Sequence, residues 1–206
     1  SQGIITVRIV AHGDTKVQAD RVTDADTTEV QSRLGSVVFG EGETTLAEAV
    51  AELLVRQCKT VATAESCTGG LLAKQLTDVP GSSGYFLRGY ITYSNEAKIS
   101  QLSVPSDLIK RDGAVSESVA RAMAVGCRDA AGTDIALSAT GIAGPTGGDS
   151  PEKPIGLVYL GLADAEGVVV RRVLFGEHLA REEIRDRASK TGLNLLRRHL
   201  LGHSRE

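Results

Sequence analysis

The chain has 206 residues, of which 41% are hydrophobic, 24% are charged and only 3% are aromatic, and its formal net charge is −3. This composition is typical of an ordinary globular protein, and without tryptophan its core must consist of Val, Ile, Leu and Ala. The slight negative charge argues against a nucleic-acid binder, which normally carries a basic patch or stripe. No apolar run approaches the roughly 18 residues of a transmembrane helix, so we expect no membrane partner.

Three cysteines, Cys58, Cys67 and Cys127, lack the CxxC or Cys/His spacing of a zinc site. Isolated thiols in odd number are typical of a reducing compartment, and the first residues do not resemble a signal peptide. We therefore expect a cytoplasmic protein without a metal or cofactor. The histidines are scattered along the chain: His12, His178, His199 and His203. Their scatter does not suggest a Ser-His-Asp triad.

The first part of the chain is polar and too small to hold a core by itself. Residues 4–10 are rich in β-branched side chains and predict a strand. From about Lys16 to Leu34, valines recur at loose helical spacing within a polar segment. We expect a piece of a small α+β domain here, ending in a linker at residues 40–43. The domain boundary is placed between residues 43 and 44.

A helix with a clear start signal follows the linker. Thr45 with Glu48 three residues later forms a capping-box pattern, and apolar residues then recur at helical spacing to Leu54. The next apolar run, Val61–Ala64, predicts a short strand.

Residues 65–70, Glu-Ser-Cys-Thr-Gly-Gly, join this strand directly to a helix-forming run that ends before Pro80. A strand-to-helix turn gathers unpaired backbone N–H groups and the positive end of a helix dipole around one hydroxyl. Ser66 is therefore a candidate nucleophile with an oxyanion site beside it. The alternative is that Ser66 or Thr68 simply caps the helix.

The remaining elements alternate between strands and helices. We expect a strand at 89–93, a short helix to about 102, a helix from a Ser116 cap to about 131, strands at 134–139, 155–163 and 168–175, and a last helix at 181–201. A long Gly-rich loop at 140–149 follows the third of these strands. This order predicts an α/β fold, a three-layer α/β/α sandwich on a mixed, partly parallel sheet with a small α+β N-terminal appendage.

The candidate chemistry gathers at the carboxyl ends of the strands, where open α/β sheets bind ligands. Because no histidine lies near Ser66 in sequence, its base would be a lysine or a tyrosine. Gly69 occupies the place of the lysine in an SxxK motif, so any basic lysine must come from elsewhere. Lys98 lies five residues beyond Tyr93, about one turn into its helix, so both side chains could reach one site.

Five segments in this order closely resemble the C-terminal domain of the CinA family: 64–70 (AESCTGG), 80–83 (PGSS), 93–98 (YSNEAK), 113–117 (GAVSE) and 141–148 (GIAGPTGG). The resemblance covers about residues 45–201. Members of that family are nicotinamide-nucleotide amidases, which hydrolyse nicotinamide mononucleotide to nicotinic acid mononucleotide and ammonia.

The resemblance implies a catalytic serine at Ser66, a tyrosine at Tyr93 and a lysine at Lys98. Ser66 would attack the carboxamide carbon, and Lys98, directly or through Tyr93, would remove its proton. Backbone N–H groups at the start of the next helix would stabilise the oxyanion.

Residues expected to contact the substrate come from the same motifs and the last helix: Glu65, Cys67, Thr68, Gly69, Gly70, Asn95, Thr140, Gly141, Ala143, Gly144, Gly147, Gly148, Arg181 and Arg185. Several of these have alternatives. Cys67 could be a nucleophile or a buried thiol. Glu65 could orient the lysine, bind ribose or pair locally. Arg181 and Arg185 could bind phosphate or form a solvated basic face.

The resemblance also implies properties of the whole protein. The first 40 or so residues look like the KH-like segment that precedes this domain in full-length relatives. A nucleotide-pyrophosphatase domain would lie before it, and the assembly would be a homodimer. Two other hypotheses are an amidase for another small amide, and a partner-binding module without catalysis.

Overall fold

The computed structural model describes residues 3–148 and 150–203. The chain divides into two compact units, Ser1–Thr44 and Thr45–Glu206. Each unit is described separately below.

The first unit contains a helix, α1 (Lys16–Leu34), and a 3-10 turn, η1 (Gly35–Val37). Thr15 caps α1 by accepting a hydrogen bond from the N–H of Gln18, and no residue of the helix is buried. The strand predicted over residues 4–10 is wrong, since this segment is extended but unpaired, with Ile5 91% exposed. A strand needs a neighbour for its backbone groups, and the described part of this unit offers none.

The second unit is built on a five-stranded sheet in the order β2-β1-β3-β4-β5. Its strands are β1 (Val61–Glu65), β2 (Phe86–Ile91), β3 (Ile135–Gly141), β4 (Leu157–Ala163) and β5 (Val168–Leu174). β1 pairs in parallel with both β2 and β3, while β4 pairs antiparallel with both β3 and β5. The predicted mixed sheet is confirmed.

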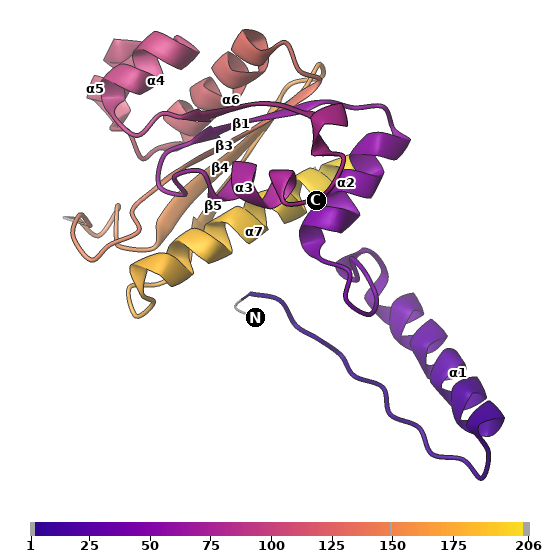
Figure 1. Ribbon diagram of the computed structural model, residues 1–206. Coiled ribbons are helices and arrows are strands. Elements are labelled where there is room, and N and C mark those ends of the chain that lie inside the picture. The colour runs from indigo at the N-terminus through magenta and orange to yellow at the C-terminus, as the bar shows by residue number, and fades with distance from the viewer. Residues whose placement is uncertain (1–2, 149, 204–206) are drawn as a thin grey trace. The chain divides into compact units, whose positions relative to one another are not determined.

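Helices cover both faces of this sheet, as Figure 1 shows. One face carries α2 (Leu46–Arg56), α3 (Leu71–Thr77) and α7 (Arg181–Leu200). The other carries α4 (Asn95–Leu102), α5 (Ser106–Asp112) and α6 (Glu117–Ala131), with α6 lying across the strands. A 3-10 turn, η2 (Ser82–Gly84), precedes β2. The three-layer α/β/α sandwich predicted from the order of elements is therefore confirmed.

Alternation along β1 determines which helix layer each side chain meets. Ala62 and Ala64 pack into an apolar cluster with Met123 of α6, whereas Glu65 contacts the start of α3. Successive strand residues point to opposite faces. Ser66, two residues after Ala64, continues on the side of α4 and α6.

Most predicted boundaries lie within two residues of the observed ones. The capping box of Thr45 and Glu48 starts α2 as predicted. β2 begins three residues earlier than expected and ends at Ile91, and α5 was not predicted. α5 has Pro105 at its N-cap without a side-chain hydrogen bond, so the capping signal that Ser94 gives for α4 is missing there.

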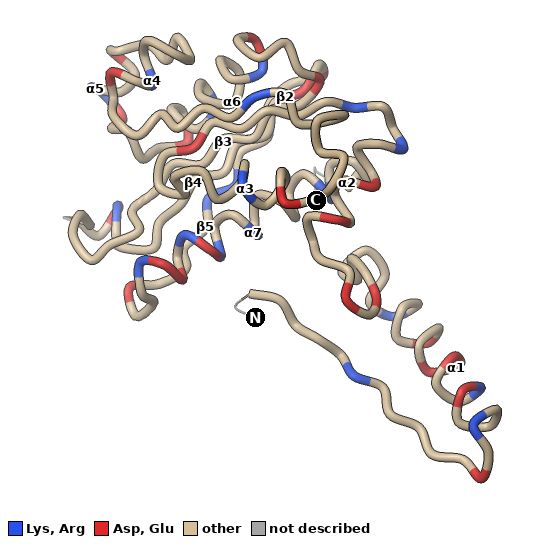
Figure 2. Tube along the Cα trace, in the orientation of Figure 1, with Lys and Arg blue, Asp and Glu red and all other residues tan. Residues whose placement is uncertain are grey.

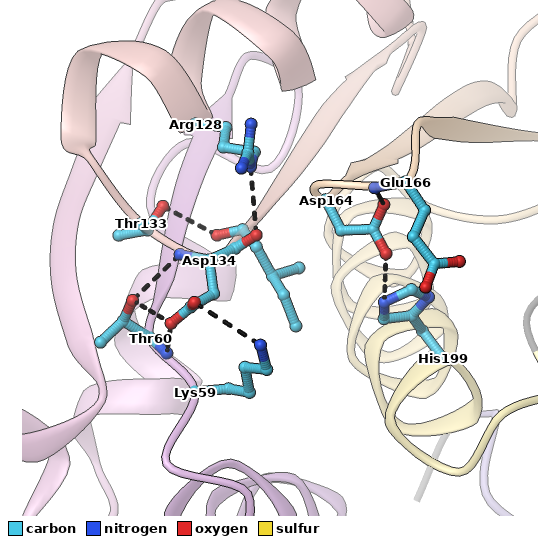
Figure 3. Close-up of polar contacts among 9 residues, drawn as sticks. Lys59, Thr60, Arg128, Thr133, Asp134, Asp164, Glu166 and His199 are labelled. Carbon is cyan, nitrogen blue, oxygen red and sulfur yellow. Dashed lines mark hydrogen bonds and ion pairs between the residues drawn. The ribbon is translucent and has the colours of Figure 1, made fainter.

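The end of the sheet that lies away from Ser66 is held by polar contacts (Figure 3). Asp134, just before β3, accepts hydrogen bonds from the N–H and hydroxyl of Thr60, just before β1. These bonds hold the pKa of Asp134 below its usual value. In a second contact, Nε2 of His199 on α7 lies 3.0 Å from Oδ2 of Asp164 in the β4–β5 turn. Both contacts join elements that are far apart in sequence, and they stabilise the end of the sheet opposite the site.

Charged residues of both signs are interspersed along α1 and α7 in Figure 2. Some form pairs one helical turn apart, such as Lys16 with Asp20 on α1. Surface pairs of this kind contribute little to stability. In the described residues, no helix is long and apolar enough to cross a bilayer.

Candidate active site

Ser66 lies immediately after β1, where the chain turns towards α3. Its backbone N–H donates to the carbonyl of Ala139, which extends the pairing of β1 with β3 by one residue. The turn then closes through Gly69 (φ +59°) and Gly70 (φ +97°). Left-handed φ values of this kind favour glycine, so both glycines are needed for so tight a connection.

Lys98 brings its amine from α4 to the hydroxyl of Ser66. Its Nζ lies 3.3 Å from the Ser66 Oγ and 2.8 Å from the carbonyl oxygen of Thr92. Two further carbonyl oxygens, those of Tyr93 and Ser94, lie 3.3 and 3.4 Å from the same nitrogen. The side chain is only 1% exposed, because α4 starts at a Ser94 cap directly after the strand and points Lys98 back into the protein. The two residues predicted to form the catalytic pair are thus in contact.

Burial is the main influence on the charge of this amine. It lowers the pKa of Lys98 below the ordinary lysine value, while the negative charge of Glu96 raises it. Lowering the pKa increases the fraction of neutral amine, the form that can take a proton from a hydroxyl.

The phenol of Tyr93 does not lie between these two groups. Its side chain is 60% exposed, and its hydroxyl accepts a hydrogen bond of 2.9 Å from Nη2 of Arg181. Tyr93 meets Lys98 through its backbone carbonyl instead. A relay from Ser66 through the tyrosine hydroxyl to Lys98 is therefore not needed, since the amine contacts Ser66 directly.

Glu65 is engaged entirely by the backbone of α3. Its buried carboxylate accepts hydrogen bonds from the N–H groups of Gly70, Leu72 and Ala73 at 2.8–3.1 Å. Of the three interpretations of Glu65, the structure shows local pairing. The expected use of N–H groups at the start of α3 as oxyanion donors is wrong for these three, because the carboxylate already occupies them.

The next two residues, Cys67 and Thr68, are buried beneath the turn. Burial raises the pKa of the Cys67 thiol to about 12, which outweighs the lowering by nearby backbone N–H groups. A thiol with this pKa stays protonated and is a poor nucleophile. The Thr68 hydroxyl has no hydrogen-bond partner among the described residues.

The Gly-rich loop begins where β3 ends, beside Ser66. Thr140 is buried, and its hydroxyl donates to the carbonyl of Ala114, so it is not directed at a ligand. Gly141 is the last residue of β3, and Ala143 and Gly144 are covered by neighbouring chain. Gly147 and Gly148 are exposed and have left-handed φ values, whereas Asp149 lies outside the described residues.

Two arginines of α7 donate hydrogen bonds to backbone carbonyls around the site. Arg181 donates to the carbonyl of Gly144 at 2.6 Å as well as to the Tyr93 hydroxyl, and so links the Gly-rich loop to the end of β2. Arg185 donates from Nε to the carbonyl of Cys67 at 3.0 Å and from Nη2 to that of Thr68 at 2.9 Å. These contacts with backbone carbonyls were not foreseen, since sequence spacing indicates only that both arginines share one helix face.

Other features lie apart from Ser66. Asn95, the first residue of α4, is exposed. A groove on the outer face of α4–α6 is lined by Leu108, Ala122 and Val125 among others, but by none of the predicted site residues. Within residues 3–148 and 150–203, no cluster of His, Cys, Asp and Glu side chains is placed to hold a metal.

Comparisons with known proteins identify the family of this chain. The family model described as the CinA C-terminal domain matches residues 43–200. The chain belongs to the CinA family.

CinA relatives match nearly the whole of this chain. A CinA-like protein of Geobacter sulfurreducens is 48% identical over 198 residues, which cover 96% of this chain and 47% of the relative. A CinA-like protein of Dictyoglomus thermophilum is 44% identical over 201 residues, with 97% and 48% covered. The chain spans about half the length of these relatives.

Solved CinA structures share the fold of the second unit. A competence/damage inducible protein of Agrobacterium tumefaciens superposes with a TM-score of 0.69 at 38% identity, covering 76% of this chain and 97% of that one. A CinA superfamily protein of Klebsiella pneumoniae gives a TM-score of 0.73 at 31% identity, with 76% and 96% covered.

Proposed function

We propose that this CinA-family protein is a nicotinamide-nucleotide amidase, which hydrolyses the carboxamide of nicotinamide mononucleotide. The observation that carries the proposal is the contact between the Lys98 amine and the Ser66 hydroxyl, 3.3 Å apart. A buried amine of lowered pKa beside a hydroxyl at a strand-to-helix turn is an arrangement that activates serine without histidine.

The first half of the reaction forms an acyl-enzyme. Lys98 takes the proton of Ser66 as its Oγ bonds to the carboxamide carbon, and the carbonyl oxygen becomes an oxyanion. When this oxyanion collapses, the C–N bond breaks and Lys98 returns the proton to the departing nitrogen, which leaves as ammonia. One amine thus serves as base and then as acid.

The second half repeats these steps with water. Lys98 takes a proton from a water molecule, which attacks the ester carbon. The Ser66 oxygen then leaves with the proton from Lys98, and nicotinic acid mononucleotide is released.

Preference for a nucleotide rests on the Gly-rich loop and on the motifs shared with the family. Exposed glycines such as Gly147 and Gly148 present backbone N–H groups to a phosphate without steric hindrance. Arg181, exposed at the start of α7, brings positive charge to the same loop. The homodimer and the preceding pyrophosphatase domain, implied by the family, belong to this proposal.

The proposal is tested by ammonia release from nicotinamide mononucleotide. We expect Ser66→Ala and Lys98→Ala each to lower kcat by at least about a thousandfold, because nucleophile and base act as a unit. Lys74→Ala is the matched control, since Lys74 is exposed and pairs with Asp78.

Three other outcomes would each contradict a different part of this proposal. Unchanged ammonia release in Ser66→Ala would rule out the serine mechanism. Equal kcat/KM for the mononucleotide and its nucleoside would reject the nucleotide and leave an amidase for another small amide. Without ammonia release by the wild type, the partner-binding hypothesis would stand.

A further inference from the structure

Two backbone N–H groups in the Ser66 turn have no oxygen acceptor among the described residues. The other N–H groups from Ser66 to Ala73 are all engaged: Ser66 with Ala139, Gly69 with Ser66, Leu71 with Thr68, and Gly70, Leu72 and Ala73 with Glu65. The two that remain are those of Cys67 and Thr68, which lie near the Cys67 sulfur and lower the pKa of its thiol but bond no oxygen in the described part of the chain. Cys67 directly follows the serine, and in α/β-hydrolases the N–H of the residue after the nucleophile is an oxyanion donor.

The direction of each free N–H is determined by the carbonyl in the same peptide unit. The peptide bonds of this turn are trans, so the C=O and N–H of each unit point in opposite directions. The carbonyl of Ser66 faces the N–H of Gly69, which turns the Cys67 N–H away from the turn. The carbonyl of Cys67 faces Nε of Arg185, which turns the Thr68 N–H away from that arginine.

We propose that Arg185 is a positioning residue that aims the Thr68 N–H at the oxyanion formed on Ser66, with the Cys67 N–H as the second donor. This inference rests on the Ser66 nucleophile of the proposed function. It assigns Arg185 no contact with the substrate, because Nε and Nη2 bind the carbonyls of Cys67 and Thr68.

The guanidinium suits this task better than an amine would. The Nε and Nη2 N–H groups lie side by side in one plane and donate to two successive carbonyls. The peptide units from Cys67 to Gly69 are therefore held in one orientation. The three donors of a lysine ammonium share one nitrogen on a flexible stem, so they lack the rigid planar fork that fixes the orientation of both carbonyls. Glu65 complements this arrangement by occupying the N–H groups of α3, which leaves the donors next to Ser66 as the free ones.

The test uses diisopropyl fluorophosphate, an uncharged reagent whose phosphoryl oxygen takes the place of the oxyanion. Ser66 Oγ bonds to phosphorus, the P–F bond breaks, fluoride leaves and Lys98 accepts the serine proton. We expect Arg185→Lys to lower the second-order rate of Ser66 labelling, followed by mass spectrometry, about 10- to 100-fold. Loss of a whole oxyanion donor costs about 10²- to 10³-fold.

Matched variants separate positioning from general effects. Arg187→Lys makes the same change on the same helix and should leave the labelling rate unchanged, since Arg187 Nε has no hydrogen-bond partner within the described part of the chain. In Arg185→Ala, added ethylguanidinium should restore labelling at least severalfold, since it can refill the site of the lost side chain. Thermal melting of each variant confirms that it is folded.

Several outcomes would overturn the inference. These are a wild-type labelling rate in Arg185→Lys, an equal loss in Arg187→Lys, no rescue of Arg185→Ala, or no labelling of the wild type. Kinetics with nicotinamide mononucleotide give a second readout: positioning lowers kcat with little change in KM, whereas a phosphate ligand would raise KM and leave labelling intact. Labelling of Ser66 in a protein that releases no ammonia would refute the proposed substrate while supporting the role of Arg185.

Discussion

At the scale of single residues, the environment of Lys98 determines what its amine can do. An ammonium group has three donors, and the carbonyls of Thr92, Tyr93 and Ser94 surround the Lys98 nitrogen on one side. In the proposed mechanism, the neutral amine keeps two donors for these carbonyls, and its lone pair accepts the proton of the Ser66 hydroxyl. The carbonyls therefore orient the base, and burial lowers its pKa.

The pH dependence of the reaction should follow this amine. The proposed mechanism requires neutral Lys98, so it predicts that kcat/KM rises with pH through a pKa below the ordinary lysine value. Glu96 is one of the charges that raise this pKa, so Glu96→Gln should move the rising limb to lower pH. The measurement is the pH profile of ammonia release, with Glu52→Gln on α2 as control. A limb that moves to higher pH in Glu96→Gln would contradict the assignment of the limb to Lys98.

At the scale of elements, the position of Lys98 depends on how closely α4 packs against α6. Gly126 of α6 lies directly against the last residue of α4, and a Cβ there would come within 1.8 Å of the carbonyl oxygen of Leu102. Glycine is required at this crossing because the backbones approach too closely for any side chain.

Gly126→Ala should therefore displace α4 and with it Lys98. We expect a loss of about 1–3 kcal/mol in the free energy of unfolding, as for other overpacked sites, and reduced ammonia release. Urea denaturation and kinetics measure the two effects. Gly84→Ala is the control, since nothing lies within 4 Å of its added Cβ. Equal stability of the two variants would show that α4 and α6 do not need this contact.

At the scale of the whole molecule, the two units differ in how they are stabilised. The second unit has a sheet covered on both faces and a buried apolar core. The helix of the first unit, α1, buries no residue. A helix without packing is marginal in water even at this length.

Removal of residues 1–44 should accordingly leave the second unit folded. We expect its Tm to change by less than about 4 °C, which corresponds to under 1 kcal/mol for a chain of this size. Ammonia release by the fragment 45–206 should match that of the whole chain. A peptide of residues 1–44 should show little helix by circular dichroism. A cooperative melting transition in that peptide, or a large fall in the Tm of the fragment, would contradict this division.

The sequence by itself was sufficient for the three-layer fold and for the pair Ser66 and Lys98. Capping at Thr45 and Ser116, glycines at the Ser66 turn and apolar periodicity are local signals, and they are readable because their physical causes act within one or two turns of chain. The prediction of a strand at residues 4–10 was wrong because strand formation does not depend on local signals alone. The β-branched residues of this segment favour extension, but a strand also needs a partner that sequence alone does not supply.

The tertiary structure decided which groups meet across long separations. Glu65 caps α3, and the Tyr93 phenol binds Arg181. Arg185 donates hydrogen bonds to the carbonyls of Cys67 and Thr68, more than 115 residues earlier in the chain. From the sequence alone, each of these side chains could pair with any of several donors or acceptors elsewhere in the chain. Only the path of the backbone selects one, because a hydrogen bond requires its two atoms to come within about 3 Å in a narrow range of angles.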